Sequence, residues 1–159
     1  MARLLLNDRT LIPAFHLPDG DGIVFDSSDL KRKKNLILFL LSDLRPGFLL
    51  KIEEARVSFL ARNAETCVIS SAPLSQVREA CKKHRLTFPV LCDEDRKVSE
   101  KFIAAAANES FAGLFITDKF GEVFFQYLTT NAAELPAMDE IVKSLDFIES
   151  QCPECGGGL

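Results

Sequence analysis

Two cysteines near the C-terminus have a spacing that suits either redox chemistry or metal binding. Cys152-Pro153-Glu154-Cys155 is the only C-x-x-C in the chain, and thiols at this spacing can form a disulfide like those of thiol oxidoreductases. As a metal site, the pair would supply two of the four ligands that zinc takes, so the others would have to come from a second subunit, from His16 or from His84. The third interpretation is a tail whose cysteines have no special role. The sequence leaves all three alternatives open.

Charges near this pair oppose its activation. The segment before it has helical periodicity, so Cys152 is expected at a helix C-terminus, where the backbone dipole is negative. Glu149 and Glu154 add negative charge, and both effects raise the pKa of a thiol. The pair is therefore expected to be a slow nucleophile unless the fold brings a cation close to it.

The other three cysteines lie in segments that predict core positions. Cys67 falls inside a predicted strand, Cys81 on one face of a predicted helix, and Cys92 at the end of a short predicted strand. We expect Cys67 and Cys92 to be small buried hydrophobes and Cys81 to be half-buried. His16 and His84 lack a partner at metal-ligand spacing, so neither is expected to be a metal ligand outside the Cys152/Cys155 alternative, and no cofactor is expected.

The element that must position any site is a strand followed directly by a helix. Residues 36–41 form an unbroken apolar run, which predicts a strand buried on both faces. Pro46 suits the first turn of a helix, and the following residues have helical period. In an open α/β sheet, ligands and nucleophiles sit in the turn after the carboxyl end of a strand. The turn from Ser42 to Phe48 is therefore where a site is expected.

The rest of the chain alternates between strand and helix patterns. We expect a mixed α/β sheet with an N-terminal β-hairpin and helices on both faces, in a single domain over residues 1–150 with a C-terminal tail over 151–159. The predicted strands cover residues 11–17, 23–25, 66–70, 88–92, 114–117 and 123–128, and the predicted helices 73–84, 98–107 and 131–150.

Composition narrows the class of function. The net charge is −4, which argues against a general nucleic-acid or anionic-membrane binder. The basic run Lys31-Arg32-Lys33-Lys34 is expected to be a solvated turn rather than a nucleic-acid or lipid patch. Five scattered cysteines, no signal peptide and no apolar run of membrane-spanning length indicate a soluble protein of a reducing compartment, and we predict a cytoplasmic location.

Four segments, in order, resemble the redoxin or peroxiredoxin-like group of alkyl hydroperoxide reductases and thiol-specific antioxidants, in the thioredoxin superfamily. Together they extend over roughly residues 11 to 128, and the resemblance implies a thioredoxin-like fold of the peroxiredoxin type. The segments are Ile12-Pro13-Ala14-Phe15-His16-Leu17, Asp29-Leu30 with Asn35-Leu36-Ile37-Leu38-Phe39, Phe88-Pro89-Val90-Leu91-Cys92-Asp93, and Phe115-Ile116-Thr117-Asp118-Lys119-Phe120-Gly121-Glu122-Val123.

The chain departs from that family pattern at the positions that carry its chemistry. Arg45 stands where the resemblance places the nucleophilic cysteine, and Phe48 where it places the second cysteine of a thioredoxin-type pair; Pro46 remains, and Ser42 takes the place of the hydroxyl residue. Ala112 replaces the proline expected before the fourth strand, and residues 104–113 contain no arginine for peroxide binding. A permanently protonated arginine is no nucleophile, so peroxidase activity by the standard mechanism is not expected.

Two classes of function follow. The first is a redoxin-family protein, antioxidant or oxidoreductase in type, whose remaining thiol–disulfide activity toward a protein partner is carried by Cys152 and Cys155. The second is a non-catalytic interaction or sensor module that uses the Ser42–Phe48 turn as its binding face, which an exposed Phe48 would favour. A zinc-bridged homodimer through Cys152 and Cys155 is a further alternative. Neither nucleic acid nor membrane is an expected partner.

Overall fold

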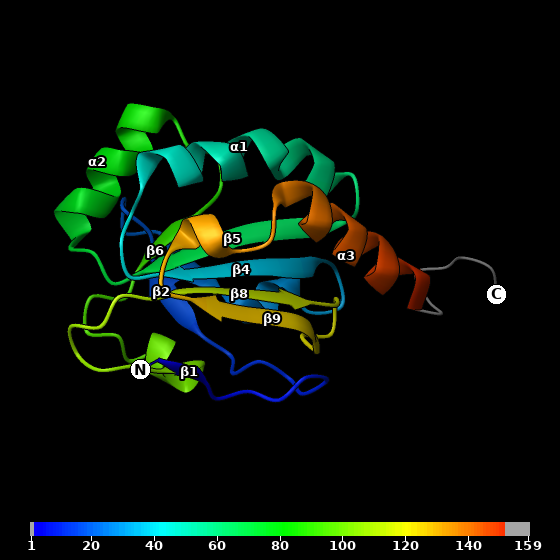
Figure 1. The fold of residues 1–159 in the computed structure, drawn as a ribbon. Coiled ribbons are helices and arrows are strands. Elements are labelled where there is room, and N and C mark those ends of the chain that lie inside the picture. The colour runs from blue at the N-terminus through cyan, green and yellow to red at the C-terminus, as the bar shows by residue number, and fades with distance from the viewer. Residues whose placement is uncertain (1, 152–159) are drawn as a thin grey trace.

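The computed structural model describes residues 2–151, and its centre is a five-stranded mixed sheet (Figure 1). The strand order is β6-β5-β4-β8-β9; β4 pairs in parallel with β5 and antiparallel with β8, so it lies in the middle. Every residue of β4 is buried, which confirms the strand predicted from its apolar run. The strands are β4 (Asn35–Leu41), β5 (Ala64–Ser70), β6 (Val90–Cys92), β8 (Ala112–Thr117) and β9 (Val123–Thr129).

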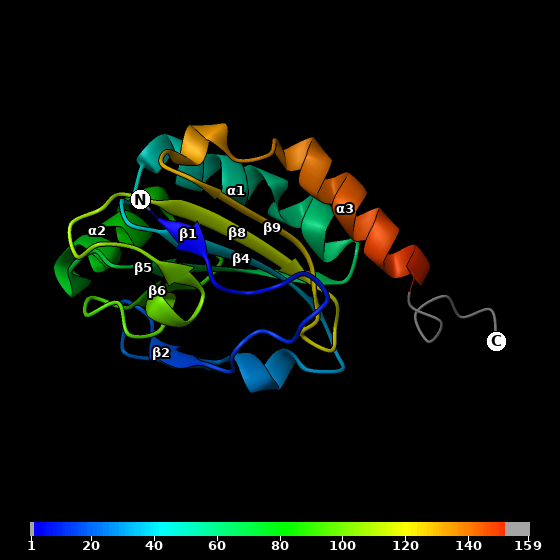
Figure 2. The same ribbon diagram turned by 60° about the horizontal axis from the view of Figure 1, so that its bottom comes forward.

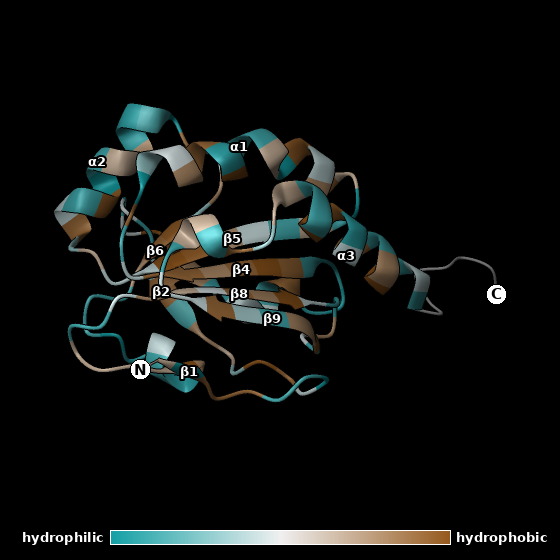
Figure 3. Ribbon diagram, in the orientation of Figure 1, coloured by the Kyte–Doolittle hydropathy of each residue, from teal (hydrophilic) through white to brown (hydrophobic). Residues whose placement is uncertain are grey.

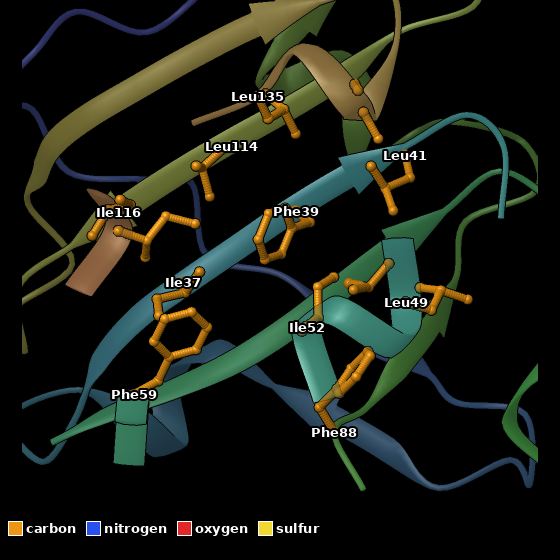
Figure 4. Packing of buried hydrophobic residues seen from close by; sticks show 14 of the residues in the cluster. Ile37, Phe39, Leu41, Leu49, Ile52, Phe59, Phe88, Leu114, Ile116 and Leu135 are labelled. Atoms are coloured by element: carbon orange, nitrogen blue, oxygen red, sulfur yellow. The ribbon is translucent and has the colours of Figure 1, made fainter. Parts of the chain in front are cut away.

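All three α-helices within residues 2–151 pack on one face of this sheet. They are α1 (Pro46–Leu60), α2 (Leu74–His84) and α3 (Met138–Gln151). Alternate residues of β4 point toward them, because successive side chains of a strand face opposite ways. Figure 4 shows Ile37 and Phe39 of β4 packed close to Ile52 and Phe59 of α1 in this first core.

The opposite face of the sheet carries a second core covered without α-helices. Leu36, Leu38 and Leu40 of β4 pack there with Phe15 and Phe102. Two short antiparallel pairs and two 3₁₀ helices cover this face, with β1 and β2 on the side of the sheet away from α1 (Figures 1 and 2). Helices thus lie on both faces as expected, but unequally. The elements are β1 (Arg3–Leu4), β2 (His16–Pro18), β3 (Val24–Asp26), η1 (Ser27–Leu30), η2 (Ser99–Lys101) and β7 (Ile103–Ala104).

The predicted N-terminal hairpin is confirmed, and the predicted helix over residues 98–107 is wrong. β2 and β3 pair antiparallel across the turn at residues 19–22. In place of the helix, η2 gives one turn and β7 then pairs with β1. The buried carboxylate of Asp93 accepts hydrogen bonds from the N–H groups of Val98 and Ser99, so it caps this single turn. A strand partner about a hundred residues away replaces the helical hydrogen bonds, and local periodicity carries no signal of it.

Polarity follows the same layers. Figure 3 shows hydrophobic residues concentrated in the central strands and hydrophilic ones along the outer sides of the helices. The predicted helix over 131–150 divides into η3 (Ala132–Glu134) and α3, with Pro136 between them. Among the described residues, no helix combines the length and the apolar character that crossing a membrane requires.

Candidate functional site

The turn between β4 and α1 presents an arginine at the start of the helix. Arg45 is the N-cap of α1, with φ −101° and ψ 116°, and its exposed side chain makes no capping hydrogen bond. Its carbonyl accepts from the N–H groups of Phe48 and Leu49, both at 3.1 Å. A helix N-terminus stabilises a thiolate through the backbone dipole. In this chain, a guanidinium-bearing residue occupies that position.

Phe48, in the first turn of α1, belongs to the core. Its side chain is half-buried, and its ring meets the ring of Phe39 edge-on, with centroids 5.4 Å apart and planes at 84°. Leu44, the residue before Arg45, packs against the same core. The condition of an exposed Phe48, which would have favoured a binding face at this turn, is therefore not met.

Ser42 ties the end of β4 to the segment before β8. Its Oγ donates to the carbonyl of Phe111 at 3.0 Å and accepts from the Phe111 N–H at 2.9 Å, and its own N–H donates to the same carbonyl at 3.1 Å. Ala112 follows as the first residue of β8, and no peptide bond within residues 2–151 is cis. The hydroxyl of Ser42 is thus engaged in holding two strand ends together.

Arg96, which no sequence pattern marks, lies close to Phe111, the residue to which Ser42 is hydrogen-bonded. Arg96 comes from the loop after β6, and its guanidinium carbon lies 5.2 Å from the ring centroid of Phe111. Its Nη1 donates to the carbonyls of Ala106 and Glu109, each at 3.2 Å. The residue has a φ of 61°, which is uncommon outside glycine. Neither a motif nor a periodicity marks this position, and the contacts indicate that Arg96 holds the loop before β8.

Of the three cysteines that the structure describes, Cys92 ends β6 at the same end of the sheet as the turn, two strands away from Leu41, and all three thiols have raised pKa values. Cys67 is fully buried in β5, and burial, followed by the nearby Glu65 carboxylate, raises its pKa well above 9.0. Cys81 on α2 and Cys92 at the end of β6 are half-buried free thiols. Burial first, and then the charge of Asp19, raises the pKa of both. Cys67 and Cys81 are placed as predicted, whereas Cys92 was expected to be buried and is half-exposed because β6 is an edge strand.

Cys152 and Cys155 lie outside the described residues, and the helix before them, α3, contacts β4 near its end. The Glu149 carboxylate near the end of α3 accepts from the side-chain amide of Asn35 at 2.6 Å. Asn35 is the first residue of β4, whereas Ser42 follows its last. Seven strand residues span about 20 Å, so α3 ends at the opposite end of the sheet from the Ser42–Phe48 turn (Figure 1). Residues 2–151 contain no group of three or more His, Cys, Asp or Glu side chains that could hold a metal ion.

Residues 9–126 match the family described as AhpC/TSA. The chain belongs to the AhpC/TSA family. This confirms the resemblance to the peroxiredoxin-like redoxins, and solved structures confirm the fold of this AhpC/TSA chain. Peroxidoxin BcpB of Mycobacterium tuberculosis superimposes with a TM-score of 0.75 at 19% identity, covering 93% of this chain and 99% of that one. AhpC of the same organism gives 0.71 at 19% identity, with 94% and 98% covered.

A relative in sequence is the Helicobacter pylori J99 protein named "Putative peroxiredoxin bcp". It is 29% identical over 97 residues, which is 59% of this AhpC/TSA chain and 64% of the relative. The match thus spans less than two thirds of the relative's length. The family and the thioredoxin-like fold are established on these comparisons, and the chemistry has to be argued from this chain's own residues.

Proposed function

We propose that this AhpC/TSA-family protein has no thiol peroxidase chemistry at its Ser42–Phe48 turn, and that its thiol–disulfide exchange is carried by Cys152 and Cys155. The observation that carries the proposal is the occupation of the α1 N-terminus by Arg45, with the half-buried Phe48 ring packed against the core three residues later. Neither side chain can attack a peroxide or a disulfide, because neither supplies a sulfur that can be oxidised.

The other cysteines support this assignment by elimination. A thiol attacks a disulfide as its thiolate, so a raised pKa lowers the reactive fraction at neutral pH. The pKa values of Cys67, Cys81 and Cys92 are all raised, with burial as the largest cause in each. The C-x-x-C pair supplies the two remaining thiols of the chain.

The proposed reaction is a two-step exchange with a disulfide in a partner protein. The thiolate of one cysteine of the pair attacks a partner sulfur, forming a mixed disulfide and releasing the other partner sulfur as a thiolate, which takes up a proton. The second cysteine then loses its proton and attacks the mixed disulfide. The products are a Cys152–Cys155 disulfide and a partner dithiol, so two electrons pass from the chain to its partner.

The test compares two double variants in the folded state. Cys152→Ser/Cys155→Ser is expected to abolish the reaction of the folded protein with the disulfide reagent 5,5′-dithiobis(2-nitrobenzoate) at pH 7.5. The matched control Cys81→Ser/Cys92→Ser removes the same number of thiols and is expected to keep that reaction. Arg45→Ala should leave the rate unchanged, and hydrogen peroxide consumption by the wild type with a dithiol reductant should equal that of the buffer.

Two outcomes oppose the proposal. If the Cys152→Ser/Cys155→Ser variant reacts as fast as the wild type while the control variant is slow, Cys81 or Cys92 is the redox thiol. If the wild type consumes peroxide faster than the buffer and Arg45→Ala does not, peroxide chemistry takes place at the Ser42–Phe48 turn.

A further inference from the structure

A partly open cavity lies at the end of the sheet opposite to the Ser42–Phe48 turn. Its volume is about 100 Å³, and it is enclosed by the segment before β2, by η1 and the turn after it, and by the turn between β8 and β9. Leu36 at the start of β4 and Thr117 at the end of β8 pair across the sheet and line its base. Leu11, Ile12 and Phe120 make much of the remaining lining apolar. The cavity can therefore accept a small apolar body.

The side chains around this cavity carry more positive than negative charge, whereas the chain as a whole is negatively charged. Lys31, Lys34 and Lys119 line it, whereas the net charge of the whole chain is −4. The one carboxylate in the lining, Asp118, already accepts hydrogen bonds from the N–H groups of Phe120 and Glu122, both at 2.9 Å. Lys34 and Lys119 are half-buried and Lys31 is exposed, and such a concentration of like charge favours an anionic occupant.

Lys34 is the lysine best placed to bind such an anion. Its side chain is half-buried, and its ammonium group has no hydrogen-bond or ion-pair partner among residues 2–151. The hydroxyl oxygen of Ser27, also in the lining, accepts from the Phe15 N–H at 2.9 Å, which leaves the hydroxyl proton to be donated. One cationic donor and one neutral donor thus line the same apolar cavity.

Backbone hydrogen bonds hold the basic side of the cavity in place. The N–H groups of Lys33 and Lys34 donate to the Leu30 carbonyl at 2.9 and 3.0 Å. The Arg32 N–H donates across to the Lys119 carbonyl at 2.5 Å, and Arg32 has a φ of 69°. The turn after η1 is therefore fixed against the β8–β9 turn. The basic run expected to be only a solvated turn forms one wall of a cavity, and a fixed wall lowers the entropic cost of binding.

We propose that this cavity binds a small free monocarboxylate with an apolar body, of the size of phenylacetate. The carboxylate would accept from the Lys34 ammonium and the Ser27 hydroxyl, and the apolar body would lie against Leu36 and Phe120. Inorganic phosphate fits less well, because it has no apolar part to cover the lining. A neutral molecule would leave the Lys34 charge without a partner.

The test uses the full-length chain and amide NMR titrations. Phenylacetate is expected to shift the amide signals of residues 119–121 in a saturable way. The isosteric neutral phenylacetamide is expected to bind at least about tenfold more weakly, since its uncharged amide loses the charge–charge attraction to the Lys34 ammonium. Lys34→Gln should weaken phenylacetate binding by about tenfold on the same grounds. Lys33→Gln is the matched control: it removes the same charge from the neighbouring residue outside the lining, and binding should change by less than about twofold.

A second variant tests the cavity without altering its charge. Ala14 is an exposed residue of the lining, and Ala14→Phe is expected to fill the cavity and abolish binding while leaving the amide spectrum of the sheet unchanged. Equal affinities for phenylacetate and phenylacetamide, or equal losses in Lys34→Gln and Lys33→Gln, would overturn the proposal. So would competition by inorganic phosphate as strong as that by phenylacetate, which would indicate a general anion site.

Discussion

At the residue scale, the turn before α1 keeps the backbone geometry of an active-site turn but has Arg45 in place of a nucleophile. The α1 N-terminus is intact, with Pro46 in its first turn and no side chain capping it, so a thiol at residue 45 would receive the helix dipole. Arg45→Cys in a Cys152→Ser/Cys155→Ser background should therefore give a thiol with a pKa below about 7.5. The pH dependence of alkylation by iodoacetamide measures it. The matched control is Asp43→Cys, at an exposed position two residues before, which should titrate near about 8.5; equal pKa values for the two new thiols would contradict the argument.

The buried thiol of Cys67 makes stability depend on pH. Burial raises its folded pKa well above the ordinary value of a cysteine, whereas an unfolded cysteine ionises at about 8.5. Below that pH both states keep the proton; above it the unfolded state releases its proton first, so the free energy of unfolding falls by up to about 1.4 kcal/mol per pH unit. Cys67→Val lacks this contribution, and its stability should fall less steeply than that of the wild type between pH of about 8.5 and 10.5. Urea denaturation of both proteins across that range decides it, and parallel curves would refute the prediction.

At the scale of elements, Ser42 is expected to stabilise the junction between β4 and β8. Ser42→Ala removes the two side-chain hydrogen bonds with Phe111 and leaves a partly buried N–H without its partner, which should cost about 1–3 kcal/mol of stability. Ser71→Ala is the control, because the Ser71 hydroxyl makes one long bond of 3.4 Å to the carbonyl of Ser42, and its loss should stay within about 0.5 kcal/mol. Urea denaturation measures both variants. A Ser42→Ala protein as stable as the Ser71→Ala protein would show that the serine hydroxyl does not stabilise this junction.

Elements with a local signal were predictable, and those that depend on distant partners were not. The buried run of β4, Pro46 at the start of α1 and the β8–β9 hairpin all carry their signal within a few residues. β7 owes its conformation to pairing with β1, which no local pattern shows. The same holds at the turn: the replacement of a cysteine by Arg45 could be read from the sequence, whereas the proximity of Arg96 to Phe111 depends on the path of a loop.

The cavity at the other end of the sheet shows why charge runs are hard to interpret. Lys31 and Lys34 belong to a basic run that is indistinguishable in sequence from a solvated turn. Their role depends on Lys119, which the β8–β9 turn brings alongside through the hydrogen bond from Arg32. A contact between residues so far apart in the chain is a property of the fold, so the site could be found only once the two turns were seen together.

At the scale of the whole molecule, folding and the proposed thiol chemistry are separable. Among residues 2–151, both hydrophobic cores are extensive, and α3 contributes its last buried core residue of that range at Ile148. Deleting residues 152–159 should therefore leave the thermal midpoint unchanged within about 2 °C, since about 1 kcal/mol corresponds to a few degrees in a domain of this size. The same deletion should abolish the reaction of the folded protein with the disulfide reagent, because it removes Cys152 and Cys155. Thermal unfolding followed by circular dichroism, beside the reagent assay on the same sample, checks both halves. A midpoint lowered by more than about 5 °C would mean that the tail is part of the folded domain. A reaction with the disulfide reagent that survives the deletion would place the redox thiol within the sheet or on α2.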